Sequence, residues 1–386
     1  MFGKDIKIKN FILKKNPNKS KEIFSLYKKF IKENNEIKFS LSKSYQDSFL
    51  HKNINKFKKI KHIALIGMGG SILGAKAIYN FLKPKNKIVT FYDGYFNPNT
   101  QKNEKKKISL IISKSGNTLE TISNSNILIK KKDINIFLTE NKKSYLTKLA
   151  EKLKCEVIHH NNYIGGRYSV LSEVGMLPAQ LMGFQPKKFR RLNQLIHNKY
   201  FTQTLIQNVM NIFNLVNLKK TNSIILNYDH KSNELFYWYQ QLVAESLGKK
   251  NKGILPLVSI MPQDNHSLMQ YYLDGKKNHF FTLFFVKENN SKKIVNSEIL
   301  KSHNYLKNKS LNQISFSQFS ATEKVFKQKK IPFRSFIVND RKEETLGELF
   351  TYFILETILL GKLMKIDPYN QPAVELIKKE TRKILN

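Results

Sequence analysis

A short apolar run followed by a hydroxyl-rich loop, at residues 108–121, most strongly limits the folds that this chain can adopt. The run ISLII at 108–112 is dominated by β-branched residues and is typical of a buried parallel strand. The loop SKSGNT at 113–118 follows it, and a helix-like pattern with Glu120 in its first turn begins directly afterwards. A buried strand that passes through a glycine-containing loop into a helix is a building unit of parallel α/β sheets.

The same order of strand and helix recurs along most of the chain. Strands are predicted at residues 62–66, 87–91, 108–112, 135–139 and 156–160, and a second set at 223–227, 280–286 and 333–338. Strands that alternate with helices predict an α/β fold with doubly wound parallel sheets. A chain of 386 residues is also long enough for two domains.

The pattern divides the chain into four parts. Residues 1–61 are expected to form an N-terminal helical segment that packs on the rest, and residues 62–186 the first α/β domain. Residues 187–343 comprise a helical bridge and the second domain, and residues 344–386 form C-terminal helices. The apolar stretch at 349–364 contains Glu356 and Lys362 and is too short to span a membrane, so we expect a buried helix there.

The loop at 113–118 has the chemistry of a small-anion site. Its side chains offer three hydroxyls and one ammonium group, from Ser113, Ser115, Thr118 and Lys114. Backbone N–H groups at the start of the following helix add further donors, so the loop predicts binding of a phosphate monoester. The Walker-type phosphate loop is excluded, because its GxxxxGK[ST] pattern is missing here. An ordinary polar turn remains the alternative.

A second glycine-rich loop, GMGGSILG at 67–74, also follows a predicted strand. It partly matches the dinucleotide-binding fingerprint, and Asp93 at the end of the next strand lies where a ribose-binding acid is expected. Ile72 occupies the place of the third glycine, however, which weakens this match. The loop could instead help to hold a sugar phosphate, because glycines allow close approach of the backbone.

Three further residues are candidates for chemistry, each with an ordinary structural alternative. Arg167 follows two glycines and could reach into a cleft, or lie on the surface of a loop. Glu245 in an apolar helix could be a half-buried base or an exposed helix residue. His266 lies in a loop, where a histidine is more often a structural hydrogen-bonding group than a catalyst.

Composition bears mainly on partners and on the cellular compartment. The net charge of +38 is spread through every segment and accompanies no nucleic-acid-binding motif, so no specific nucleic-acid partner is expected. The single cysteine, Cys155, excludes an internal disulfide and is typical of a reducing cytosol. Lysines interrupt every apolar run in residues 1–20, so neither a secretory signal nor a membrane partner is expected.

Taken together, six segments resemble the glucose-6-phosphate isomerase (phosphoglucose isomerase) family. They are GMGGSILG at 67–74, SKSGNTLET at 113–121, GGRYSVLSEVG at 165–175, AESLGK at 244–249, DNHS at 264–267 and DPYNQPAVELIK at 367–378. The resemblance implies two sugar-isomerase domains of flavodoxin-like topology and a cytoplasmic homodimer without a cofactor or metal. It implies the interconversion of glucose 6-phosphate and fructose 6-phosphate through an enediol, in glycolysis and gluconeogenesis.

The resemblance also implies roles for individual residues. Glu245 is the expected base, His266 the ring-opening residue, supplied by the other subunit, and Arg167 faces the reacting carbon–oxygen edge. Gln371 is expected to contact the sugar, and Lys378, seven residues later, to assist at the ring oxygen, so that the C-terminal helices complete the site. The substrate-binding residues implied are Gly70, Ser71, Ser113, Lys114, Ser115 and Thr118. These roles suit an isomerisation in which one carboxylate serves two adjacent carbons and a guanidinium stabilises the enediolate charge.

Departures from the family pattern leave alternatives open. Gly116 and Asn117 are closer to the general sugar-isomerase pattern, which includes dual-specificity glucose/mannose 6-phosphate enzymes, and Asn265 replaces a usual glutamine. A non-catalytic sugar-phosphate-binding protein would keep the loop at 113–118 but would need neither Glu245 nor His266. A basic protein associated with nucleic acid is the third alternative, and it predicts no isomerase activity.

Overall fold

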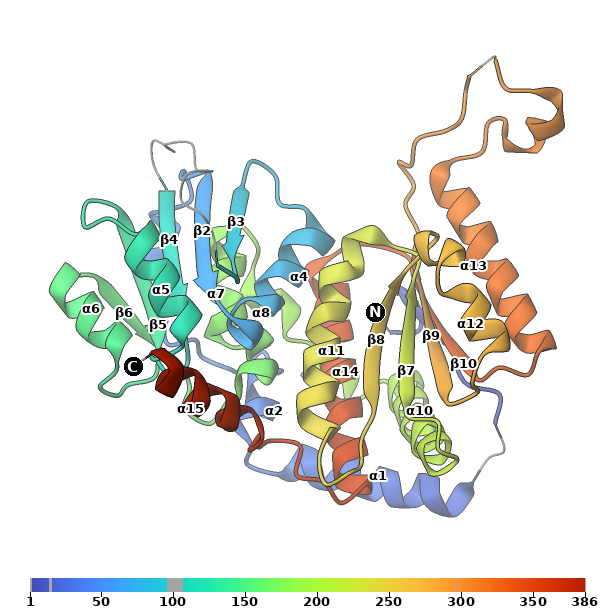
Figure 1. The fold of residues 1–386 in the computed structure, drawn as a ribbon, viewed down its shortest axis with the longest axis horizontal. Helices are drawn as coiled ribbons and strands as arrows, with labels where there is room; N and C mark the ends of the chain where they lie inside the picture. Colours follow the sequence, from blue (N-terminus) through green and yellow to red (C-terminus); the bar gives the residue numbers. More distant parts are fainter. Residues whose placement is uncertain (1, 14–15, 96–106, 297, 386) are drawn as a thin grey trace.

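Two parallel sheets form the framework of the protein (Figure 1). The structure is a computed structural model that describes residues 2–13, 16–95, 107–296 and 298–385. The first sheet has the order β3–β2–β4–β5–β6, and all its described pairings are parallel. Its strands are β2 (His62–Gly67), β3 (Ile88–Tyr92), β4 (Lys107–Ile112), β5 (Ile134–Thr139) and β6 (Glu156–His159). These are the five strands predicted for the first α/β domain.

The second sheet repeats this order and adds one antiparallel strand. Its order is β8–β7–β9–β10–β1, where the first four strands are parallel and β1 pairs antiparallel with β10. The strands are β7 (Asn222–Asn227), β8 (Leu255–Ile260), β9 (His279–Val286), β10 (Phe333–Val338) and β1 (Ile6–Lys9). Two doubly wound parallel sheets, the fold class predicted from the sequence, are therefore confirmed.

Two strands of the second sheet were absent from the sequence prediction, and both lie at its edges. Strand β8 contains Pro256, which lacks an N–H donor and is tolerated mainly in edge strands. Strand β1 lies in a segment for which helices were expected, and only its alternating Ile6 and Ile8 are buried. Such short or interrupted patterns give little signal in a single sequence.

Helices cover both faces of each sheet and fill the space between the sheets. Those of the N-terminal segment and first domain are α1 (Pro17–Lys32), α2 (Glu36–Ser40), α3 (His51–Asn55), α4 (Leu73–Leu82), α5 (Leu119–Leu128), α6 (Tyr145–Leu153) and α7 (Glu173–Leu181). Those that follow are α8 (Pro186–Phe189), α9 (Leu192–Leu195), α10 (Lys199–Asn217), α11 (Asn233–Leu247), α12 (Met269–Asp274), α13 (Leu311–Gln328), α14 (Glu343–Leu363) and α15 (Val374–Leu385). Figure 1 shows α4, α11 and α14 between the two sheets, where α4 packs on α11 and α11 on α14.

Helix α14 is buried along nearly its whole length, as its apolar sequence predicted. Its central carboxylate, Glu356, accepts hydrogen bonds from both terminal guanidinium nitrogens of the buried Arg334 of β10, with Nη2 at 2.9 Å. A buried charge of this kind is tolerated only when it is paired, so the two residues depend on each other. No described helix is long and apolar enough to cross a membrane.

Candidate active site

Arg167 lies at the centre of the candidate site, and its side chain is only 2% exposed. It is carried by a short 3₁₀ helix, η3 (Gly166–Leu171), that packs against α11. Its Nε donates to Ser246 Oγ at 2.8 Å, and its Nη2 donates to the carbonyls of Pro368 and Asn370 at 2.7 and 3.1 Å. The guanidinium is therefore fixed from two sides, and only Nη1 remains for other groups.

Nη1 of Arg167 meets two other residues that the resemblance assigned to the site. Glu245 Oε2 lies 3.3 Å from it, and Gln371 Oε1 accepts a hydrogen bond from it at 2.5 Å. The three residues come from η3, from the end of α11 and from the turn that precedes α15. The structure thus brings Arg167, Glu245 and Gln371 together from segments more than 70 residues apart, and we call these three residues the Arg167 cluster.

Glu245 faces a cavity of about 720 Å³, which is large enough for a hexose phosphate. Gln371 and Lys249 also line this cavity, and the Glu245 side chain is 26% exposed there. Lys249 Nζ donates to the carbonyl of Asp367 at 2.6 Å and so ties the end of α11 to the turn that precedes α15. Partial burial, with the nearby Arg167 charge, lowers the pKa of Lys249.

Gln241 is a site residue that the sequence analysis missed. It lies one helical turn before Glu245 on α11, and its Nε2 donates to Glu245 Oε1 at 2.9 Å. With Arg167 on Oε2, both carboxylate oxygens are therefore held in place. The i, i+4 spacing to a suspected base is the signal that could have identified it.

The glycine loop that follows β2 packs directly against this cluster. A methyl group at Gly70 would lie 2.2 Å from the backbone carbon of Gly166 and 2.7 Å from the nitrogen of Arg167. Gly69 has a φ of +53°, and a methyl group there would lie 2.8 Å from Gln241 Nε2. These glycines therefore allow neighbouring groups to approach the loop closely.

Asp93, the acid of the alternative dinucleotide-binding interpretation, forms an ion pair with Lys76 of α4.

We predict that Gly70→Ala lowers both stability and activity. The added methyl group cannot fit without moving the backbone that carries Arg167, and overpacking of this kind costs about 1–3 kcal/mol. Thermal unfolding should show a lower midpoint, and kcat/KM should fall at temperatures where the variant is folded. Gly94→Ala is a matched control, because a methyl group at Gly94 meets no atom within 4 Å. Equal behaviour of the two variants would contradict the prediction.

The loop at 113–118 lies beside the glycine loop, because Ile112 of β4 pairs with Gly67 of β2. Its hydroxyls converge: Ser113 Oγ is 2.8 Å and Ser115 Oγ 3.5 Å from Thr118 Oγ1. The Lys114 side chain contacts other residues instead: its Nζ donates to the carbonyl of Asn162 at 2.9 Å and lies 3.5 Å from Glu140 Oε1. We call these three converging hydroxyl groups the hydroxyl cradle; they lie at the N-terminus of α5, a position that suits an anion.

His266 and Lys378 lie apart from the Arg167 cluster. His266 is exposed in a short 3₁₀ helix, η5 (Gln263–His266), just beyond the carboxyl end of β8. Lys378 is exposed on α15, where its Nζ contacts Glu375 at 2.6 Å. The described part of the chain therefore unites some of the expected site residues and leaves these two outside. Among the same residues, no group of three or more His, Cys, Asp and Glu side chains could hold a metal ion.

Comparison with known proteins identifies the family of the chain. The model of the phosphoglucose isomerase family matches residues 43–255. A glucose-6-phosphate isomerase of Methanocaldococcus jannaschii is 32% identical over 357 residues, which cover 87% of this chain and 88% of that protein. The chain belongs to the phosphoglucose isomerase family.

Other members of the phosphoglucose isomerase family resemble the chain over a similar extent. The Campylobacter jejuni glucose-6-phosphate isomerase is 30% identical over 351 residues, covering 85% of this chain and 86% of that enzyme. Among solved structures, a hypothetical protein of Thermus thermophilus matches with a TM-score of 0.81 at 22% identity, over 95% and 94% of the two chains. A Chlamydia trachomatis glucose-6-phosphate isomerase matches with a TM-score of 0.68 at 18% identity, over 87% and 72%. These two likenesses concern the fold.

Proposed function

We propose that this member of the phosphoglucose isomerase family interconverts glucose 6-phosphate and fructose 6-phosphate, a step of glycolysis and gluconeogenesis. The observation that carries the proposal is the contact of the buried Arg167 guanidinium with both Glu245 and Gln371 beside a cavity of sugar size. Relatives that cover most of the chain carry the name glucose-6-phosphate isomerase, which agrees with this proposal.

Aldose–ketose isomerisation moves a proton between two adjacent carbons, and the Arg167 cluster suits this chemistry. Glu245 would take the proton from C2 of the open-chain aldose and return it to C1, since one carboxylate can reach both carbons. Arg167 would stabilise the negative charge of the enediolate, because a guanidinium remains protonated throughout. Gln241 and Arg167 hold the two oxygens of Glu245, so the base is oriented before the substrate arrives.

The hydroxyl cradle would hold the phosphate of the substrate, with Gly70, Ser71 and Lys114 around it. This grip is remote from the reacting carbons and keeps them in register with Glu245. Lys114 would first exchange its contacts with Asn162 and Glu140 for the phosphate. Lys378 would assist at the ring oxygen, and α15, which has no buried residue, would have to approach the cavity to bring it there.

A coupled assay of fructose 6-phosphate conversion tests the proposed reaction directly. We expect turnover that produces glucose 6-phosphate, in a protein purified free of host isomerase. A protein that binds fructose 6-phosphate but does not convert it would refute the proposal and favour a non-catalytic binding protein. Conversion of mannose 6-phosphate at a similar rate would instead favour a dual-specificity enzyme.

The hydroxyl cradle makes a separate prediction about binding. Removing the hydroxyls of Ser115 and Thr118 in a double alanine variant should weaken fructose 6-phosphate binding by about 1–3 kcal/mol, since the charged phosphate oxygens lose two donors. Calorimetric titration of the wild type and the variant measures this difference. Ser302→Ala with Thr221→Ala is the control, because neither hydroxyl lies in the cradle or lines the cavity of Glu245. Unchanged affinity in the cradle variant would place the phosphate elsewhere.

We further propose a cytoplasmic homodimer in which His266 reaches the active site of the partner. Helix α11 runs back along the second sheet, so that its end, with Glu245, lies near the start of β8, whereas His266 follows the end of that strand. The six residues of β8 span about 20 Å at roughly 3.3 Å per residue, too far for a histidine side chain to bridge. A second copy of the chain is the simplest source of the missing imidazole. The single cysteine, Cys155, suits a reducing compartment.

A further inference from the structure

The second sheet has a loop cluster in the same topological position as the hydroxyl cradle of the first. In each sheet the first strand of the domain, β2 or β7, lies between two parallel neighbours, and the chain departs to opposite sides of it. The loops that follow β2 and β4 form the candidate phosphate site. The equivalent loops follow β7 and β9, and ligands of open α/β sheets commonly bind at such a switch point, beyond the carboxyl ends of the strands.

A cavity of about 590 Å³ opens at this second switch point. Its walls come from the loops after β7, β8 and β9 and from the start of α13. The polar and charged residues lining it include Asp229, His230, Lys231, Glu288, Lys292 and Asn312. The cavity lies within the size range of small-molecule sites and is separate from the cavity of Glu245, with which it shares no lining residue.

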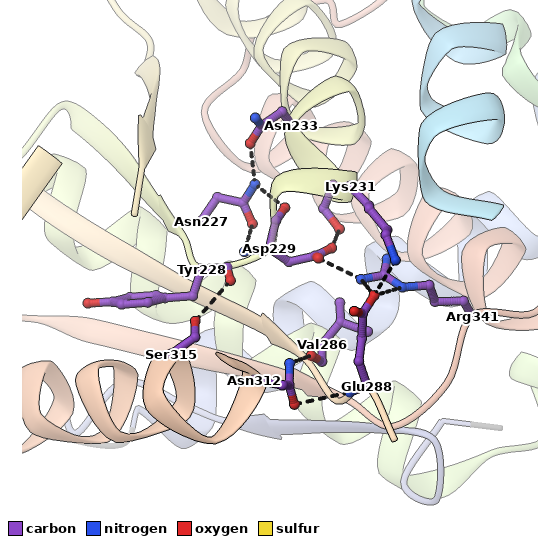
Figure 2. Close-up of polar contacts among 11 residues, drawn as sticks. Asn227, Tyr228, Asp229, Lys231, Asn233, Val286, Glu288, Asn312, Ser315 and Arg341 are labelled. Atoms are coloured by element: carbon purple, nitrogen blue, oxygen red, sulfur yellow. Dashed lines mark hydrogen bonds and ion pairs between the residues drawn. The ribbon is translucent and has the colours of Figure 1, made fainter. Parts of the chain in front are cut away.

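Three residues that line this cavity, Asp229, Lys231 and Glu288, form an ion-pair network with Arg341, and we call this network the floor (Figure 2). Arg341, which follows β10, donates to Asp229 Oδ1 at 2.5 Å and to Glu288 Oε1 from Nε at 3.0 Å. Lys231 Nζ donates to the same Glu288 oxygen at 2.6 Å. Two carboxylates are thus balanced by two cations, and the floor carries no net charge.

Other polar groups at the cavity are not used by this network. All the described contacts of the Glu288 carboxylate involve Oε1, which leaves Oε2 as a free acceptor among the described residues. His230 and Lys292 are exposed at the wall, and neither side chain has a hydrogen-bond or ion-pair partner in the described part of the chain. A neutral floor with an added ammonium group and an imidazole at the wall makes the cavity attractive to an anion.

We propose that this cavity is a second binding site for a phosphorylated sugar. Lys292 and His230 would hold the phosphate, beside the N-terminus of the 18-residue helix α13. Glu288 Oε2 would accept hydrogen bonds from sugar hydroxyls, as a carboxylate at a strand end does for ribose in dinucleotide-binding folds.

The second site binds without catalysing the isomerisation. Burial opposes ionisation of Glu288, but Lys231 and Arg341 outweigh it and lower the pKa of its carboxyl group. A carboxylate of lowered pKa is a weak base toward a carbon-bound proton. The pocket therefore suits an effector, and its occupancy does not depend on the reaction proposed for Glu245.

Counting bound ligand tests this proposal without reference to turnover. Equilibrium dialysis with labelled fructose 6-phosphate and, separately, ribose 5-phosphate should give two equivalents per chain for at least one of them. The variant H230Q/K292Q should retain one equivalent, with the other weakened about tenfold or more. The variant S115A/T118A should weaken the equivalent bound at the hydroxyl cradle and leave the one at the second cavity unchanged, so the two sites can be distinguished.

A control separates a specific site from the general positive charge of the protein. The variant H303Q/K301Q makes the same changes on the projecting segment between β9 and α13, where both residues are exposed, and should retain two equivalents (Figure 1). One equivalent in the wild type with both sugars would overturn the proposal. So would two equivalents in H230Q/K292Q, or an equal loss in the control variant.

Discussion

Glu245→Gln is expected to lower kcat for the interconversion of glucose 6-phosphate and fructose 6-phosphate by about 10²- to 10⁴-fold. Glutamine keeps the size of the side chain, and its amide oxygen can still accept from Arg167 while Gln241 turns its own amide oxygen toward the new NH2 group, but glutamine cannot accept the C2 proton. The coupled assay measures kcat, and proton exchange gives an independent readout. In heavy water the wild type should introduce deuterium at C2 of the aldose, and the variant should not.

Glu234→Gln is the matched control for this experiment. Glu234 lies in the first turn of the same helix, far from Arg167, and its pKa is raised by burial, so a neutral side chain should be tolerated there. This variant should keep turnover within a few-fold of the wild type. Fructose 6-phosphate affinity should persist in Glu245→Gln, because the hydroxyl cradle is separate from the base. Near-normal turnover and exchange in Glu245→Gln would mean that another residue is the base.

Most of the framework could be predicted from the sequence, because buried parallel strands have a strong local pattern. The runs at 62–66, 108–112 and 280–286 are mostly apolar, and each became an internal strand of its sheet. Strands β1 and β8 were not predictable in the same way. One is short, the other contains Pro256, and each becomes a strand only by pairing with a sheet edge that forms elsewhere in the chain.

The partners of the site residues could not be predicted from the sequence alone. The motif GGR identified Arg167, but Pro368 and Asn370, whose carbonyls hold its guanidinium, lie 201 and 203 residues away. The same holds for the ion-pair network of the second cavity, where Arg341 reaches Asp229 across 112 residues. Such contacts depend on the packing of α11 against η3 and of the strand ends against one another, which local patterns do not report.

Arginines and lysines occupy different places in this highly basic protein: among the described residues some arginines are buried, and no lysine is. Lysines and arginines number 67 against 29 acidic residues, so most cations cannot have an acidic partner. The buried cations among the described residues are Arg167, Arg190 and Arg334, with no lysine among them, and each donates several hydrogen bonds. A planar guanidinium satisfies several acceptors at once, whereas lysines remain at the hydrated surface. Among the described residues the excess positive charge is therefore carried mainly by lysines that are not buried.

Mixed dimers of Glu245→Gln and His266→Gln chains are expected to regain about half of the wild-type activity, if each active site of a symmetric dimer combines two chains. In such a mixed dimer one site receives both altered residues, and the other receives Glu245 from one chain and His266 from its partner. The two parent homodimers should be impaired by about 10²-fold or more, since each of their sites lacks an acid–base group. Differently tagged chains, co-expressed and purified through both tags, allow this activity to be measured.

The arrangement of the two substitutions provides the decisive control for the mixed dimer. When both substitutions are placed in one chain and paired with a wild-type chain, each site should lack one group, and activity should stay near that of the parent variants. If His266 acted within its own protomer, this second pairing would keep one intact site and the first pairing would keep none. The two pairings therefore predict opposite results for a shared site and for a self-contained one. Activity in the second pairing alone would show that α12 and η5 must move to bring His266 to Glu245 of the same chain, across the length of β8.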